Sequence, residues 1–108
     1  MSKIRIINNT EELLAVLAED NEQMITTPQN AIRYMGLAYI EQMLAEAFRA
    51  YPQVYQRFLL NVSDDAAICH QALKGGIKHI LFTGSEEMFL KLKNIADGFE
   101  TVLYFKDY

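Results

Sequence analysis

The sequence has little cysteine and little proline, with one Cys (Cys69), two Pro and no Trp among 108 residues. A single cysteine excludes an intramolecular disulfide, and no CxxC pair or Cys/His zinc spacing is present. No apolar run approaches the ~20 residues that a membrane-spanning helix needs. The amino-terminal stretch MSKIRIINN turns polar too early for a signal peptide. We therefore expect a protein of the reducing cytoplasm that does not enter a membrane.

Positive charge is also sparse. Ten Lys and Arg residues are scattered among fourteen Asp and Glu, which gives a net charge of −4 and a pI of about 5.1. A nucleic-acid-binding protein needs a dense basic surface that releases counterions from the phosphates. An anionic lipid surface likewise selects clustered basic residues. The composition therefore predicts neither nucleic acid nor a membrane as a partner.

Apolar segments are what the chain has in quantity. Hydrophobic residues make up 51% and charged residues 22%, ordinary values for a folded domain, and 108 residues is the size of one domain. Strands are expected at residues 3–7, 24–27, 58–62, 77–83 and 101–105, with helices beginning at Thr10, near residue 29, at Ser63 and at Ser85. The order β-α-β-α-β-α-β-α-β predicts a single α/β domain over residues 1–108, with three layers (α/β/α) and a mainly parallel five-stranded sheet.

Three of the four helix starts at the carboxyl ends of the strands share a pattern of a hydroxyl residue followed by two carboxylates, and Thr27-Pro28-Gln29 is the exception. Parallel sheets bind ligands at this edge, so the candidate rim comprises Asn8, Thr26, Asp64, Asp65, Thr83 and Ser85. Helix capping explains the pattern, and a site for a hard cation such as Mg²⁺ is the alternative. Both interpretations remain open at the level of sequence.

A phosphate site is not expected at Thr83-Gly84-Ser85. Glu86 and Glu87 already occupy the positive end of the following helix dipole. The glycine-rich phosphate-binding motifs are absent. A phosphate arriving there would meet two negative charges and no neighbouring cation.

Three resemblances are visible. Asp64, Thr83 and Lys106 resemble the phosphoacceptor Asp, the switch Thr and the Lys of receiver domains, although Asn8 and Asn9 stand where receivers place an acidic pair. The stretch HQALKGGIKHILFTGS is similar to the phosphate-binding half of β/α barrels, and a half-barrel of this length would have to pair with another. From Thr26 onward, the frame TTPxxAxxxxG, YP, ALxxG and LFxG is similar to small uncharacterised bacterial α/β proteins. That third resemblance implies the fold and a bacterial cytoplasmic setting, but no chemistry.

The sequence contains no recognisable combination of a nucleophile with a catalytic base. Cys69 and His70 are adjacent, and neighbours on a helix do not face each other, so Cys69 is expected in the core. Ser63 and Ser85 lack a base, and G-x-S-x-G is absent. These features favour a protein that is not an enzyme, and they predict no cofactor and no metal.

The helix expected over residues 29–50 has an apolar stripe that covers about half of its circumference, wider than the ~100° of an ordinary surface helix. The excess lies either under neighbouring elements or in an interface, for which a homodimer is the common solution. The predicted interface residues are Leu37, Leu44 and Phe48, with Tyr34 and Tyr51 at the edge. The predicted function is therefore self-association or binding to a protein partner. Binding of a small molecule or a divalent cation at the acidic rim, as a sensor or an enzyme, is the alternative.

Overall fold

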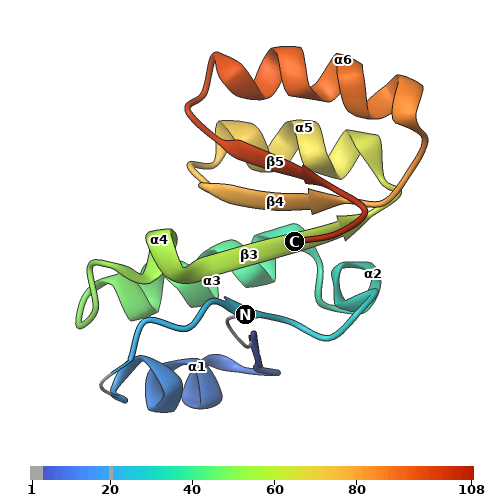
Figure 1. Ribbon diagram of the computed structural model, residues 1–108. Helices are drawn as coiled ribbons and strands as arrows, with labels where there is room; N and C mark the ends of the chain where they lie inside the picture. Colours follow the sequence, from blue (N-terminus) through green and yellow to red (C-terminus); the bar gives the residue numbers. More distant parts are fainter. Residues whose placement is uncertain (1–3, 20) are drawn as a thin grey trace.

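Five short strands form one parallel sheet in the order β1-β2-β3-β4-β5 (Figure 1). The computed structural model describes residues 4–19 and 21–108. The strands are β1 (Arg5–Ile6), β2 (Ile25–Thr26), β3 (Phe58–Ser63), β4 (His79–Phe82) and β5 (Val102–Phe105). The helices are α1 (Thr10–Leu17), α2 (Ala31–Met35), α3 (Leu37–Phe48), α4 (Val54–Arg57), α5 (Ala66–Lys74) and α6 (Glu86–Asp97). The predicted α/β fold with a parallel five-stranded sheet is thus confirmed.

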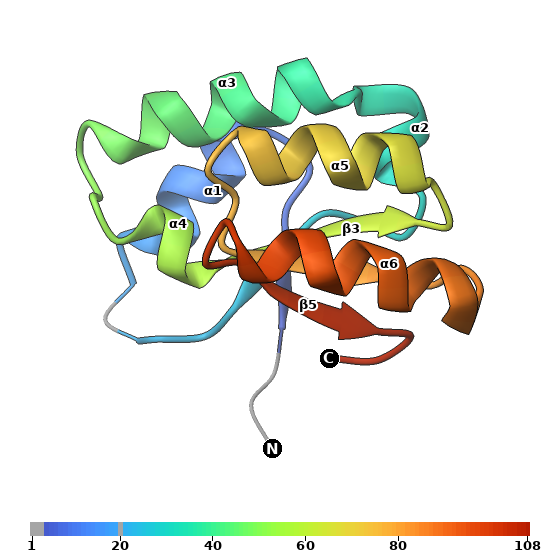
Figure 2. The same ribbon diagram turned by 90° about the horizontal axis from the view of Figure 1, so that it is seen from above.

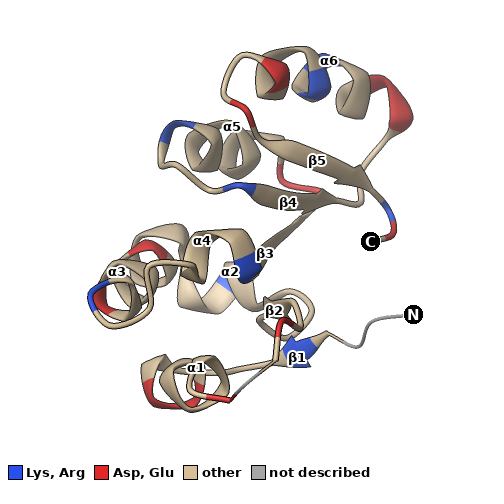
Figure 3. Cartoon of the chain, turned by 60° about the vertical axis from the view of Figure 1, so that its left-hand side comes forward, with Lys and Arg blue, Asp and Glu red and all other residues tan. Residues whose placement is uncertain are grey.

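The helices lie on one face of the sheet only. Each connection steps to the next strand in the same direction, and right-handed crossovers that all step the same way place their helices on the same side. Figures 2 and 3 show α1, α3, α5 and α6 along one side of the strands. The expected three layers are therefore corrected to two. The reason is the strand order, which the sequence pattern did not give.

The hydrophobic core lies between this helix layer and the sheet. Leu60, Ile80 and Leu103 are register partners on β3, β4 and β5, and all three belong to the core. Buried side chains from α1, α3, α5 and α6 complete it, and a fully buried Leu or Ile stabilises the fold by roughly 1.5–3 kcal/mol. Among the described residues, no helix combines the length and the apolar character needed to cross a membrane.

Helix α3 buries more of its surface inside the chain than an ordinary surface helix, because it packs against α1 and α4 and lies on the helix side of the sheet (Figure 3). Ile40, Met43, Leu44 and Ala47 are all completely or almost completely buried. The prediction of Leu44 as an interface residue is therefore corrected, since its side chain is part of the intramolecular core. Much of the apolar excess seen in the sequence is covered by neighbouring helices.

A glycine divides the long helix that was expected over residues 29–50. Gly36 ends α2 and begins α3 with φ 82° and ψ 152°. Side chains with a Cβ are strongly disfavoured in that region of backbone space, and glycine is not. Gly36 therefore sets the angle between α2 and α3.

Replacing Gly36 by alanine should lower the free energy of unfolding by about 1–3 kcal/mol, because alanine cannot adopt this conformation without strain. Urea denaturation followed by circular dichroism measures the change. Gly98→Ala is the matched control, since Gly98 has φ −75° and its nearest atom to an added Cβ is Ile95 O at 3.5 Å. Equal midpoints for the two variants would show that Gly36 carries no conformational constraint.

Candidate functional site

The helix-free face of the sheet is built from two rows of side chains in register. One row crosses all five strands and consists of Ile6, Thr26, Leu59, His79 and Val102. The other crosses the last three strands and consists of Asn61, Leu81 and Tyr104. Neighbouring residues on a strand point to opposite faces, so these rows face away from the helices. We call this surface the open face.

Apolar side chains at both ends of the longer row remain in contact with solvent. Ile6 on β1 is 61% exposed and Val102 on β5 is 49% exposed, whereas Leu59 at the centre is only 2% exposed. Parallel sheets are almost always covered on both faces. Ile6 and Val102 therefore leave apolar surface exposed at the two edges of the helix-free face.

The last residues of the chain turn back across the open face. Lys106 has a left-handed backbone with φ 64°, and the ring of Tyr108 packs edge-on against Tyr104 with 4.8 Å between the ring centroids. In Figure 1 the label C accordingly lies in front of β3. A hollow of about 330 Å³ remains between this segment and the sheet, and its walls include Thr26, Leu59 and Thr83.

The predicted rim residues do not form one site. Thr26 and Thr83 both line the hollow on the open face. Asp64 instead forms an ion pair with Arg33 at 2.9 Å in solvent, and Asp65 and Ser85 accept backbone N–H groups as the caps of α5 and α6. The acidic helix starts belong to the helix layer, whereas the hollow lies on the opposite face of the sheet.

Capping also explains Asn8 and the first helix. Asn9, rather than the expected Thr10, caps α1 by accepting a hydrogen bond from the Glu12 N–H at 2.8 Å. The Glu12 carboxylate accepts in return from the Asn8 N–H at 2.8 Å. This reciprocal pair satisfies two backbone donors. In the described part of the chain, no group of three or more His, Cys, Asp or Glu side chains is close enough to hold a metal ion.

Cys69 lies in the core, as the sequence predicted. Burial raises the pKa of its thiol to about 11. The thiolate, which is the nucleophilic form, is therefore strongly disfavoured in the folded protein.

The Cys69 thiol should react with a disulfide reagent such as DTNB at pH 8 at least about 100-fold more slowly in the native protein than in guanidinium chloride. The raised pKa alone reduces the thiolate fraction by about this factor. Absorbance at 412 nm follows the reaction. Stoichiometric labelling of native protein within seconds would contradict a buried, structural role.

His79 lies at the centre of the open face beside β5. Its Nδ1 is 3.1 Å from the hydroxyl oxygen of Tyr104, and the two rings are stacked. Partial burial lowers the pKa of His79 below its ordinary value. The neutral imidazole is therefore the form that the folded protein prefers.

The free energy of unfolding should decrease as the pH falls below about 6.5, the ordinary pKa of histidine. In that range the unfolded chain binds more protons than the folded one, because His79 has the lower pKa when folded, and linkage then makes stability rise with pH. Urea denaturation at pH 7.5 and pH 5.5 measures this effect. His79→Gln should reduce the difference between the two pH values, and an undiminished difference would assign it to other groups.

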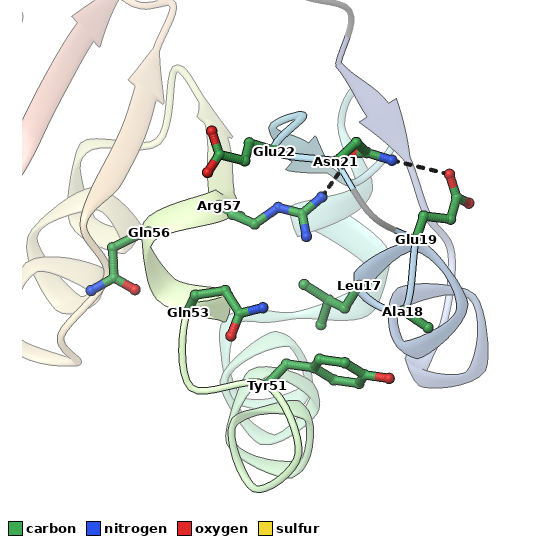
Figure 4. Close-up of a pocket in the computed structure, with 9 residues that line it drawn as sticks. All are labelled: Leu17, Ala18, Glu19, Asn21, Glu22, Tyr51, Gln53, Gln56 and Arg57. Carbon is green, nitrogen blue, oxygen red and sulfur yellow. Dashed lines mark hydrogen bonds between the residues drawn. The ribbon is translucent and has the colours of Figure 1, made fainter.

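A second hollow lies at the amino ends of the strands, between the end of α1, the segment that leads into β2, and α4 (Figure 4). Its volume is about 640 Å³, and its walls comprise Leu17, Ala18, Glu19, Asn21, Glu22, Tyr51, Gln53, Gln56 and Arg57. We call it the Arg57 pocket. Sequence reasoning missed it, since its residues come from three segments and form no motif. One signal was present: a charged residue, Arg57, directly precedes the apolar strand FLLNV.

Comparisons with known proteins give one relative. No protein-family model and no solved structure matches the chain. The sequence is 31% identical over 86 residues to the uncharacterized protein RP547 of Rickettsia prowazekii (strain Madrid E), and the alignment covers 79% of this chain and 81% of that protein. This match confirms the resemblance to small uncharacterised bacterial proteins.

Proposed function

We propose that this chain, which belongs to the same family as the Rickettsia prowazekii protein RP547, acts as a non-enzymatic domain by associating with a second copy of itself across the open face. The observation that carries the proposal is the row of side chains from Ile6 to Val102, which is apolar at both exposed ends and has no helix over it. Covering this row removes apolar surface from water, which is the main favourable term in protein association.

The lack of charged side chains in the two rows favours a second copy of the chain as the partner at the open face. The two rows contain no Asp, Glu, Lys or Arg, even though the whole chain carries a net charge of −4. Two identical surfaces meet without repulsion only when they carry little charge or alternate its sign. A neutral His79 fits this condition.

A symmetric dimer sets the area that the interface has to bury. A stable interface buries about 800 Å² on each partner, which is roughly an eighth of the 6284 Å² accessible surface of this chain. A symmetric dimer uses the same patch on both copies. The hollow beside Thr26 and Thr83 belongs to this patch and would be covered with it.

The outer surface of α2 and α3 is the competing interface. Tyr34 and Phe48 remain 68% and 48% exposed, and Leu37 and Tyr51 are half-buried. The ring of Phe48 packs on Tyr55, with 5.7 Å between the centroids, so part of its apolar surface is already covered within the chain. We assign the interface to the open face because no helix covers its apolar side chains.

Sedimentation at micromolar concentration should give a mass of about twice 12.4 kDa. Val102→Glu should produce a monomer with an unchanged circular dichroism spectrum, because it places two like charges in the interface. Phe48→Glu is the matched control, with nearly the same exposure in the folded chain, and it should retain the dimer.

A wild-type monomer at 100 μM would overturn self-association. A Phe48→Glu variant that dissociates while Val102→Glu stays dimeric would transfer the interface to the surface of α2 and α3.

We infer a cytoplasmic location from the state of Cys69. A lone thiol buried in the core is compatible with the reducing cytoplasm, whereas secreted proteins of this size commonly use disulfides to stabilise the fold.

A further inference from the structure

A buried guanidinium lines the Arg57 pocket. Arg57 is the last residue of α4 and directly precedes β3, and it is only 7% exposed. Its Nε donates to the carbonyl oxygen of Gln23 at 3.1 Å, and Nη2 donates to Oδ1 of Asn21 at 3.1 Å. Both acceptors are neutral. A guanidinium has five N–H donors, so these two bonds leave three without an acceptor in the described residues.

The carboxylates that share the pocket do not pair with Arg57. Glu19 accepts two hydrogen bonds from Arg5, at 2.7 and 3.2 Å, and a third from Asn21. The hydrogen bond from Arg5 is the main cause that holds the pKa of Glu19 below its usual range, and the more distant charge of Arg57 also lowers it. Glu22 points away from the guanidinium in Figure 4. Within residues 4–19 and 21–108, Arg57 thus forms no ion pair with a carboxylate.

The position of the guanidinium makes it available to a ligand. In Figure 4 one of its amino nitrogens points to Asn21, and the other points toward the space between Leu17 and Gln53. Among the described residues, the buried side-chain atom that lacks a hydrogen-bond partner is Thr27 Oγ1, so the free amino group of Arg57 is instead open to the cavity. The neighbouring cavity of about 640 Å³ provides room for a small molecule whose anionic group reaches the guanidinium directly.

We propose that the Arg57 pocket binds a small organic molecule through a single carboxylate. The planar fork of arginine matches a carboxylate with two parallel hydrogen bonds. The side-chain amides of Gln53 and Gln56 line the same cavity, and each offers both a donor and an acceptor to the rest of the ligand. The ligand is therefore of amino-acid size, with a polar remainder.

The charge of the pocket selects against dianions. Glu19 and Glu22 lie in its wall with Arg57, and their negative charges repel a second negative charge on a ligand. A carboxylate with a neutral or cationic remainder meets no such repulsion. The expected order of affinity is glycine, then acetate, then inorganic phosphate.

Titration of the ¹⁵N-labelled protein with sodium acetate, glycine and inorganic phosphate at constant ionic strength tests the proposal. Acetate and glycine should produce saturable shifts of the Arg57 Nε–H signal and of the Gln53 and Gln56 side-chain amides, with dissociation constants in the millimolar range. The Nε–H signal of Arg33, which is exposed and paired with Asp64, should not move.

Two variants separate binding from a purely structural role of Arg57. Arg57→Lys keeps the charge but loses the fork, and it should weaken glycine binding at least 10-fold, whereas Arg33→Lys should leave binding unchanged. If the Arg57 variant does not fold, the wild-type titration alone decides. Absent or linear shifts at Arg57, or equal shifts at Arg33, would overturn the site, and phosphate binding more tightly than glycine would overturn the ligand class.

Discussion

The handedness of the crossover connection is the constraint on which the rest of this structure depends. All the connections step to the next strand in the same direction, and right-handed crossovers then place every helix on one side of the sheet. The fold therefore has one well-packed core and one sheet face with no helix over it. Leu59 and Leu60 illustrate the result, since they are adjacent in β3 but point to opposite faces. Leu60 points toward the helix layer, and Leu59 points toward the open face.

The sequence predicted the elements better than their arrangement. Strand and helix patterns are local, and residues such as those of FLLNV and HILF identify buried strands directly. Strand order depends on contacts between distant segments, and the same alternating pattern is compatible with helices on one face or on both. Continuous apolar runs in β3 and β4 were read as burial between two helix layers. In the structure, the outward-facing half of each run lies on the open face instead.

The candidate sites show the same difference between local sequence patterns, which can be predicted, and contacts between distant segments, which cannot. Of the acidic helix starts, Ser85 was located correctly as the cap of α6, whereas the caps of α1 and α5 are Asn9 and Asp65 rather than Thr10 and Ser63, which ends β3. The Arg57 pocket depends on hydrogen bonds from α4 to the segment around residues 21–23, more than thirty residues earlier in the sequence. No periodicity or spacing reports such a contact. Leu44 shows the opposite error: its apolar stripe was visible in the sequence, but only the packing of α1 against α3 decides that the stripe is core.

The two surfaces differ in the interaction that would bring a partner to them. The two rows of the open face carry no charged side chain and are apolar at their exposed ends, so their association with another molecule is driven by removal of surface from water and tolerates a wide range of salt concentration. The Arg57 pocket instead contains a charge that is nine-tenths buried, and its occupancy depends on one anion placed in one geometry. They lie apart in the fold, one on the helix-free face and the other around the end of α1 and α4 at the amino ends of the strands. A ligand in the pocket would fix the segment that leads into β2, and β2 contributes Thr26 to the open face. Arg57 itself directly precedes β3, which contributes Leu59 and Asn61 to the same face, so the pocket is connected to the open face through both β2 and β3.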